Sequence, residues 1–325
     1  GSVIAVGLMH FLNKKINLGN YEDDSFVVYI VKFTKTGAVD TSFHAPQLGR
    51  GETIIPIANG QYMVAGNKPT ENDKVSGRQV SGGEISLSRQ PQYIPDVNGN
   101  PYLVKINADG TQDVTWATPG DFQGTITSAI HTRDNEFVVS GYFHLPVNTG
   151  KYTGTPMLRA RPSSINEPTT IMLKFNADGT YDKNFVLPSN IISVEGAYNV
   201  QEIENYLVVI GAFRVPTVGN YPANILRFGT DGTLDYNFLP SVDDIEGRYA
   251  SPMYAMSLTS STYTIGGKGS LLQVSSEGKD VTQNSDFITL AENSNVYTML
   301  PVGENNFVLG GEFALYPSNL ILAKR

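Results

Sequence analysis

Short apolar runs that end in glycine recur along the chain. They are rich in β-branched and aromatic residues, and they lie at residues 3–7, 62–66, 137–141, 207–211, 264–267 and 308–311. Runs of this length and composition are typical of strands rather than helices. A glycine at the same place in each run predicts a β-bulge or a close backbone approach there.

A second set of apolar runs is followed by a polar Asp-Gly turn. The strong copies of this turn centre on Asp109-Gly110, Asp178-Gly179 and Asp231-Gly232, and weaker copies follow residues 30–33 and 272–274. Asp-Gly between two strands predicts a tight hairpin. We expect a short fourth strand after it, and we expect Asp113, Asp182 and Asp235 to accept hydrogen bonds from free backbone N–H groups.

Aromatic residues also repeat with these turns. They lie at Phe43, Trp116, Phe185, Phe238 and Phe287. Repetition at the structural period predicts that these rings pack between successive repeats, not that they bind a ligand.

A third set of runs precedes each glycine-ending run across a short polar turn, and these runs lie at residues 53–57, 126–130, 198–203, 254–258 and 296–300. Asn59-Gly60 is the clearest of these turns. One repeat is therefore four antiparallel strands. Four short strands every ~40–50 residues are the pattern of a β-propeller blade, and the wider gaps in this chain come from long loops between the second and third strands.

The count of runs predicts an all-β fold: a six-bladed β-propeller with four-stranded blades, formed as a single domain by residues 1–325. The first blade lacks its first strand. In the last blade the third strand, residues 320–324, ends the chain, and no Asp-Gly turn follows it. We therefore expect incomplete first and last blades and a domain excised from a longer chain.

Composition narrows the function classes. The net charge is −8 and the pI about 5.0, which disfavours nucleic acid and anionic membrane as partners. No apolar run approaches the roughly 20 residues of a membrane-spanning helix. The absence of cysteine excludes disulfides, thiol nucleophiles and zinc–thiolate sites. We expect a monomer without a cofactor.

The Asn-Ala-Asp-Gly-Thr-x-Asp-x-x-Phe turn after Leu-x-Lys/Arg-Phe resembles the delta-60 repeat β-propellers. The resemblance is specific at residues 105–116, 174–185 and 227–238, moderate at both ends of the chain and poor at 272–287. It implies a bacterial, Bacteroidetes-like, secreted or surface protein such as a lipoprotein, located extracellularly or in the cell envelope. It also implies a binding or adhesive role, with a glycan or another surface protein as partner. It brings no catalytic residues.

The residues favour a protein without catalytic activity. The Asp-Gly turn lacks the closing glutamate of an EF-hand calcium loop, and it departs from the Asp-box of sialidase propellers because Asp and Gly are adjacent. His10 and His144 occupy equivalent places, but no carboxylate recurs beside them, so a metal pair is disfavoured. A glycan-active hydrolase or lyase using Asp243, Asp244 and Glu246 remains an alternative, as does a purely structural spacer.

Two long loops, at residues 67–101 and 144–169, stand out from the repeat. Long loops on a regular scaffold are often functional. Tyrosines outside the period lie in or beside such loops, at Tyr21, Tyr93, Tyr102, Tyr152, Tyr221 and Tyr316. We predict a ligand site for an acidic sugar or an anionic peptide on this face, formed by Arg78, Arg89, Tyr93, Tyr152, Arg159 and Arg161.

Overall fold

The computed structural model describes residues 2–12, 25–46, 48–68, 100–116, 123–144, 169–188, 191–215, 221–238, 252–259, 261–279, 281, 290, 294–302 and 306–313. Its contacts divide the chain into two compact units, which are described separately. Unit 1 comprises residues 1–153 and 166–183, and unit 2 comprises residues 154–165 and 184–325.

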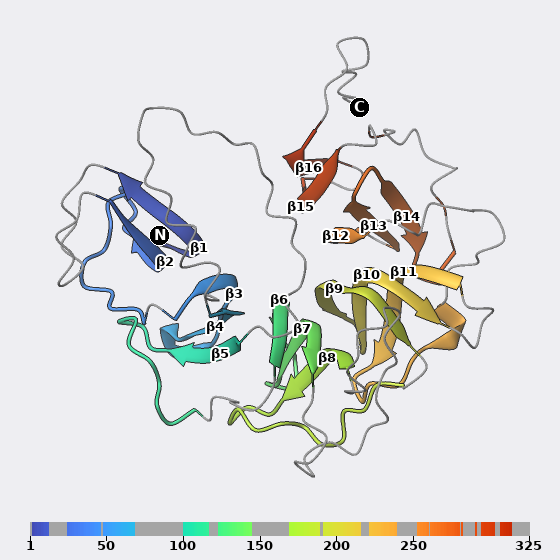
Figure 1. Cartoon of the computed structure of the whole chain (residues 1–325), viewed down its shortest axis with the longest axis horizontal. Helices are drawn as coiled ribbons and strands as arrows, with labels where there is room; N and C mark the ends of the chain where they lie inside the picture. Colours follow the sequence, from blue (N-terminus) through green and yellow to red (C-terminus); the bar gives the residue numbers. More distant parts are fainter. Residues whose placement is uncertain are drawn as a thin grey trace, which may run out of the picture. The chain divides into compact units, whose positions relative to one another are not determined.

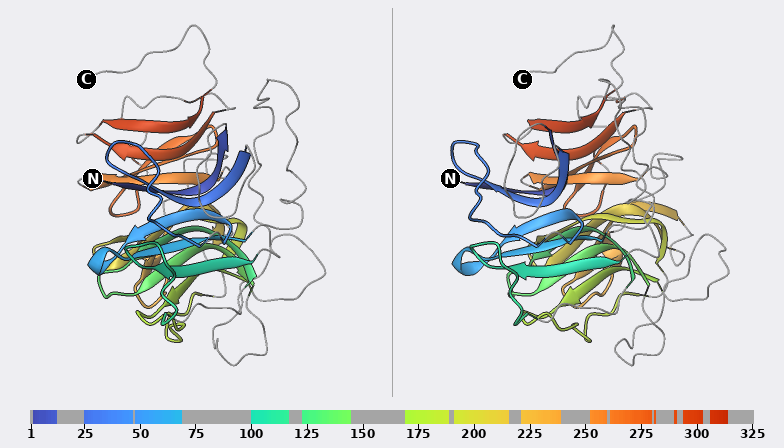
Figure 2. Two further views of the ribbon diagram at one scale, coloured as in Figure 1. Left: turned by 90° about the vertical axis from the view of Figure 1, so that its left-hand side faces the viewer. Right: turned by 60° about the vertical axis from the view of Figure 1, so that its left-hand side comes forward.

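The described part of unit 1 forms three small antiparallel sheets (Figure 1). The first pairs β1 (Val3–Leu12) with β2 (Ser25–Phe33). The second contains β3 (Arg50–Pro56), β4 (Tyr62–Asn67) and β5 (Pro101–Ile106), seen from two further sides in Figure 2. The third contains β6 (Gln123–His131), β7 (Phe137–His144) and β8 (Thr169–Phe175).

Unit 2 repeats this plan. Its sheets are β9 (Ile192–Ile203), β10 (Tyr206–Val215) and β11 (Tyr221–Gly229); β12 (Met253–Thr259), β13 (Thr262–Gly267) and β14 (Leu271–Ser275); and β15 (Asn295–Pro301) with β16 (Phe307–Glu312). In the described ranges the helical content is two 3-10 turns, η1 (Ala58–Gly60) and η3 (Tyr236–Phe238). The all-β prediction is confirmed.

The first three strands of the repeat were predicted correctly wherever they can be seen, and residues 320–324 lie outside the described residues. The predicted short fourth strand is not confirmed. Among the described residues its place holds a single β-bridge in four repeats, for example Ile106 with Gln112 and Phe175 with Tyr181. The reason is that a second turn begins immediately: the Trp116 N–H donates to the Asp113 carbonyl oxygen at 3.4 Å.

The recurrent glycine of the second strand lies where a β-bulge brings the neighbouring strand unusually close. A Cβ on Gly66 would lie 2.2 Å from the Arg50 carbonyl oxygen, and one on Gly267 would lie 2.1 Å from that of Pro252. In each case the adjacent first strand carries a bulge at this level. Both predicted roles of the glycine, a bulge and a close approach, are therefore confirmed.

The Asp-Gly turn has the geometry of a type I turn with a G1 bulge. In the second repeat the Gly110 N–H donates to the Asn107 carbonyl oxygen at 2.9 Å, and the Asn107 N–H donates to that of Thr111 at 2.7 Å. Gly110 has φ of 92°. The Asp109 carboxylate accepts from the Thr111 N–H at 3.0 Å and from its hydroxyl at 2.7 Å, so a side chain closes the turn.

These turns also join successive repeats within each unit. In unit 1 the His44 N–H donates to the Asp109 carbonyl oxygen at 2.8 Å, and in unit 2 the Val186 N–H donates to that of Asp231 at 3.2 Å. A Cβ on Gly110 would lie 2.8 Å from the His44 nitrogen. The turn glycine therefore supplies both a positive φ and the space in which the preceding repeat docks.

Replacing Gly110 with alanine is expected to destabilise unit 1 by about 2 kcal/mol, because it adds a contact with His44 to the cost of a positive φ. Gly37 provides the control: it has φ of 81° at the same turn position, and nothing lies within 4 Å of a Cβ built there. Gly37→Ala should cost about 1 kcal/mol, for conformation alone. Urea unfolding followed by Trp116 fluorescence measures both. Equal losses would contradict the docking role.

The periodic aromatic residues pack as predicted where they are described. Phe43 is buried with Val64 and Tyr102 of the following sheet. Trp116 packs against Ile126 and Phe137 of the next one, and its indole N–H donates to the Ala177 carbonyl oxygen at 3.1 Å.

In unit 2, Phe238 lies edge-on to Tyr263 at 5.5 Å. Phe185 is also buried, whereas Phe287 lies outside the described residues. The core of each unit is thus formed between consecutive sheets.

Candidate functional site

The ligand site predicted from the long loops lies outside the described residues. Its six members are Arg78, Arg89, Tyr93, Tyr152, Arg159 and Arg161. The same holds for Asp243, Asp244 and Glu246 of the enzymatic alternative and for the side chains of His10 and His144. Tyr102 is described and is 2% exposed, and its hydroxyl donates to the Gly49 carbonyl oxygen at 3.0 Å. This tyrosine belongs to the core.

The structure shows a different recurrent position with chemical interest. Among the described strands, five sheets have a β-bulge between their first two strands at the same level, and in each of them the extra residue lies on the first strand. These bulged residues are Glu52, Thr127, Tyr198, Tyr254 and Tyr297. Bulges redirect a side chain away from the regular alternation of a strand and are frequent beside functional sites.

In unit 2 the three bulged residues are tyrosines, and their rings form a continuous row. Tyr198 of β9 lies edge-on to Tyr254 of β12, with ring centroids 4.8 Å apart and an interplanar angle of 81°. Tyr254 and Tyr297 of β15 are 5.6 Å apart at 48°. Tyr198 and Tyr254 are partly exposed, and Tyr297 is 48% exposed. We call these three residues the tyrosine row.

A carboxylate lies at the exposed end of this row. The Tyr297 hydroxyl donates to Oε2 of Glu312 at 3.3 Å, and Nδ2 of Asn295 donates to the same oxygen at 3.4 Å. Partial burial, followed by the charge of Glu312 and this hydrogen bond, raises the pKa of Tyr297. At the other end, Nε2 of Gln201 donates to the Met256 carbonyl oxygen at 3.1 Å and ties β9 to β12.

The fold does not require an aromatic residue at the bulge. In unit 1 the same position holds Glu52, which pairs with Arg50 at 3.0 Å, and Thr127, whose hydroxyl donates to the Ser140 carbonyl oxygen at 3.0 Å. A carboxylate, a hydroxyl and a phenol are therefore all compatible with the backbone. Unit 2 has a tyrosine at this position in three consecutive sheets, and the repeat architecture does not require it.

The tyrosine row was not predicted, although the sequence contains a signal for it. Tyr198, Tyr254 and Tyr297 are 56 and 43 positions apart, close to the spacings of Gly211, Gly267 and Gly311. The aromatic residues that follow the Asp-Gly turns repeat with the same period and are buried in the core. The period alone therefore could not separate a buried aromatic residue from an exposed one.

A second recurrent group is an ion pair between a basic residue of the third strand and the aspartate eight positions after it. The pairs are Lys32–Asp40 at 3.5 Å, Lys105–Asp113 at 3.2 Å, Lys174–Asp182 at 3.3 Å and Arg227–Asp235 at 2.7 Å. In the fifth repeat Gln273 and Val281 hold these places, and the Val281 N–H still donates to the Gln273 carbonyl oxygen at 2.9 Å. The backbone turn is therefore retained where the charges are absent.

The paired aspartates serve the turn. Oδ1 of Asp113 accepts from the Thr115 N–H at 3.0 Å and from its hydroxyl at 2.6 Å, and Oδ1 of Asp235 accepts from the Asn237 N–H at 3.0 Å. The Thr115 hydroxyl, together with Lys105 and against the opposing effect of burial, lowers the pKa of Asp113. The predicted role is confirmed for these two aspartates, which are structural.

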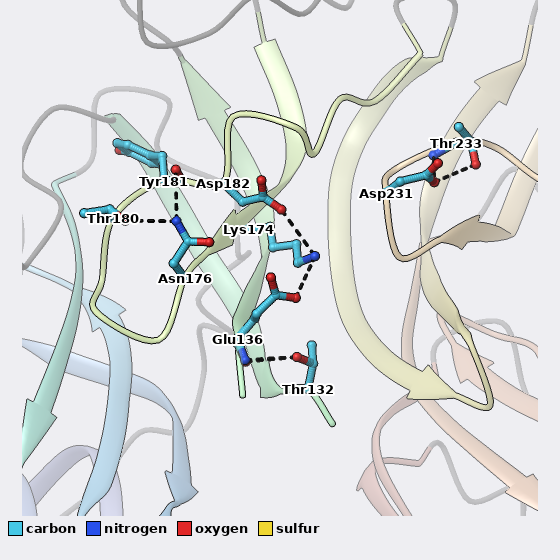
Figure 3. A network of polar contacts seen from close by, with 9 residues as sticks. All are labelled: Thr132, Glu136, Lys174, Asn176, Thr180, Tyr181, Asp182, Asp231 and Thr233. Atoms are coloured by element: carbon cyan, nitrogen blue, oxygen red, sulfur yellow. Dashed lines mark hydrogen bonds and ion pairs between the residues drawn. The ribbon is translucent and has the colours of Figure 1, made fainter. Parts of the chain in front are cut away.

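Lys174 in unit 1 has an additional partner (Figure 3). Its ammonium group lies 2.6 Å from Oε2 of Glu136 as well as 3.3 Å from Oδ2 of Asp182, and its side chain is only 9% exposed. Burial alone would lower the pKa of Lys174, but the hydrogen bonds and charges of Glu136 and Asp182 outweigh it and raise the pKa. We interpret this network as structural and call it the Lys174 network.

In the described part of the chain, no group of three or more His, Cys, Asp or Glu side chains is arranged to hold a metal ion. Nor does any helix there have the length and apolarity needed to cross a membrane.

One repeat matches a known protein family. Residues 206–238 match the family model described as "Domain of unknown function (DUF5122) beta-propeller". The match covers β10, β11, the Asp231-Gly232 turn and Phe238. This part of the chain is therefore similar to a β-propeller family. No curated protein matches the chain.

Several solved structures are similar at low identity. The computationally designed protein Ika8 is 11% identical over 90% of this chain and 79% of that chain, with a TM-score of 0.42. YCF48 bound to D1 peptide is 13% identical over 89% and 72%, with a TM-score of 0.43. The extracellular domain of a putative one-component system from B. thetaiotaomicron is 11% identical over 88% and 50%, with a TM-score of 0.24. At these TM-scores, nothing about the fold or ligand of this chain rests on the likenesses.

Proposed function

We propose that the chain is a non-enzymatic binding module of the bacterial cell surface, built as a six-bladed β-propeller of the delta-60 repeat type, with glycans as ligands. The propeller is supported by the repeated three-stranded antiparallel sheets, by the turns that dock one repeat on the next, and by the family match at residues 206–238. Extracellular or envelope localisation is part of the same proposal.

The observation that carries the binding function is the tyrosine row. Exposed aromatic planes beside amide and carboxylate groups are the chemistry with which proteins bind sugars, since a tyrosine combines an apolar face with a polar tip. Tyr198, Tyr254 and Tyr297 occupy positions where the fold accepts other residues, so packing of the repeat does not account for them. The long loops at 67–101 and 144–169 remain a predicted second contact region.

The alternative is a glycan-active hydrolase or lyase on the same scaffold. A glycan array and a hydrolase screen on the same panel separate the two. We expect retention of at least one glycan class without release of products. Product release would overturn the non-enzymatic proposal, and failure to retain any glycan would leave the structural spacer as the better description.

A further inference from the structure

Resting on this binding function, we propose that the tyrosine row is a site for a neutral saccharide, with Tyr297 as the stacking platform and Glu312 as the acceptor for a sugar hydroxyl. This assigns a ligand class and a location distinct from the predicted arginine-containing loops.

Tyr297 is the ring best placed to receive a ligand. It is 48% exposed, whereas its neighbour Tyr254 is more enclosed, with Tyr198 edge-on to one side and Tyr297 on the other. These contacts hold the Tyr254 ring in place, so the row is ordered before a ligand arrives. A pyranose presents a patch of C–H groups with slight positive charge, which complements the negative face of an aromatic ring.

Glu312 supplies the polar part of the site. Its Oε2 accepts the hydrogen bonds from Tyr297 and Asn295, and in the described residues Oε1 has no hydrogen-bond or ion-pair partner. The side chain is exposed. Hydrogen bonds from a hydroxyl to an ionised carboxylate are stronger than those between neutral groups, so a sugar stacked on Tyr297 can donate to this oxygen.

The charge of this end of the row selects against acidic sugars. In the part of unit 2 that the structure describes, no lysine or arginine pairs with Glu312, and Arg227 is bound to Asp235 at 2.7 Å. A uronate carboxylate beside Glu312 would place two like charges together without a cation between them. The whole chain also carries a net charge of −8, which disfavours the approach of anionic ligands.

Isothermal titration calorimetry tests this with two sets of probes of equal length: neutral gluco-, manno- and galacto-oligosaccharides, and oligogalacturonate. We expect wild-type protein to bind a neutral probe and not the uronate. Tyr297→Ala should weaken binding about tenfold or more, as loss of a central aromatic contact does, and Tyr297→Phe should retain most of the affinity. Tyr236→Ala is the matched control, because Tyr236 is 50% exposed elsewhere in unit 2.

Glu312→Gln tests the charge. The amide keeps the shape of the side chain and an acceptor for Tyr297, so we expect weaker binding of the neutral probe and measurable binding of oligogalacturonate. Neutral binding that is unchanged in Tyr297→Ala and Glu312→Gln would place the site elsewhere and overturn the inference. If wild-type protein binds the uronate and Tyr297→Ala does not, the ligand class is overturned but the proposed function is left intact. Binding of no glycan on the wider array would overturn the proposed function itself.

Discussion

Gly66→Ala is expected to destabilise unit 1 by about 3 kcal/mol, the upper part of the usual range for overpacking. An added Cβ would lie 2.2 Å from the Arg50 carbonyl oxygen and 2.7 Å from the Tyr102 hydroxyl oxygen. The first of these atoms is backbone of the paired strand β3 and cannot rotate away, so β3 and β4 must separate at the bulge. Trp116 is the only tryptophan of the chain and is buried in unit 1, so its fluorescence in urea measures the loss.

Gly7→Ala is the matched control, because Gly7 holds the same place in β1, and no described atom lies within 4 Å of a Cβ built there. Its φ of 147° adds a conformational cost of about 1 kcal/mol, but no steric clash is added to that cost. If both variants lose the same stability, the approach of the carbonyl oxygen is not what requires glycine in this strand.

Lys174→Met is expected to cost about 3 kcal/mol, the lower end of what is measured when one partner of a buried ion pair is removed. The substitution leaves Glu136 and Asp182, whose side chains are 22% and 13% exposed, without the cation that both contact. The charge-free alternative at this position is already present in the fifth repeat, but there both members of the pair are replaced, so no charge is left behind.

Lys105→Met is the matched control, since Lys105 holds the same place on β5. Among the described residues Asp113 is its only ion-pair partner, and its side chain is 23% exposed. It should cost no more than about 1 kcal/mol. The pKa of Lys174 is raised above its ordinary 10.5. Its contribution is therefore complete below that pH and is lost only as the pH rises through the folded value. The difference in unfolding free energy between the two variants should stay constant around neutral pH. Equal losses of stability in Lys105→Met and Lys174→Met would argue against the structural role of the Lys174 network.

Several features of the fold could be predicted because they depend on residues close together in the sequence. The β-branched runs form strands because their side chains suit an extended backbone. Asp109-Gly110 makes a turn because Asp109 bonds to Thr111 two positions on and glycine accepts the positive φ. The repeated glycine of the second strand signalled a bulge and a close approach, although the carbonyl oxygen that approaches it belongs to the paired first strand.

Other features required the tertiary structure because they depend on which distant residues meet. Only the hydrogen bond from the Val281 N–H to the Gln273 carbonyl oxygen shows that Val281 takes the place of the paired aspartate in the fifth repeat. The second partner of Lys174 comes from Glu136, 38 positions earlier, and no local pattern links them. The predicted fourth strand is a single bridge because the capping turn at Asp113 begins before a ladder can form.

The tyrosine row shows the same division most clearly. The sequence by itself determined that Tyr198, Tyr254 and Tyr297 lie in the first strands of successive repeats. Whether those rings enter the core or remain exposed was decided by the register of each first strand against its partner, because a bulge adds one residue and changes which face of the sheet a side chain points to. That register is set by hydrogen bonds between strands, which a pattern of apolar and polar residues along one strand does not contain.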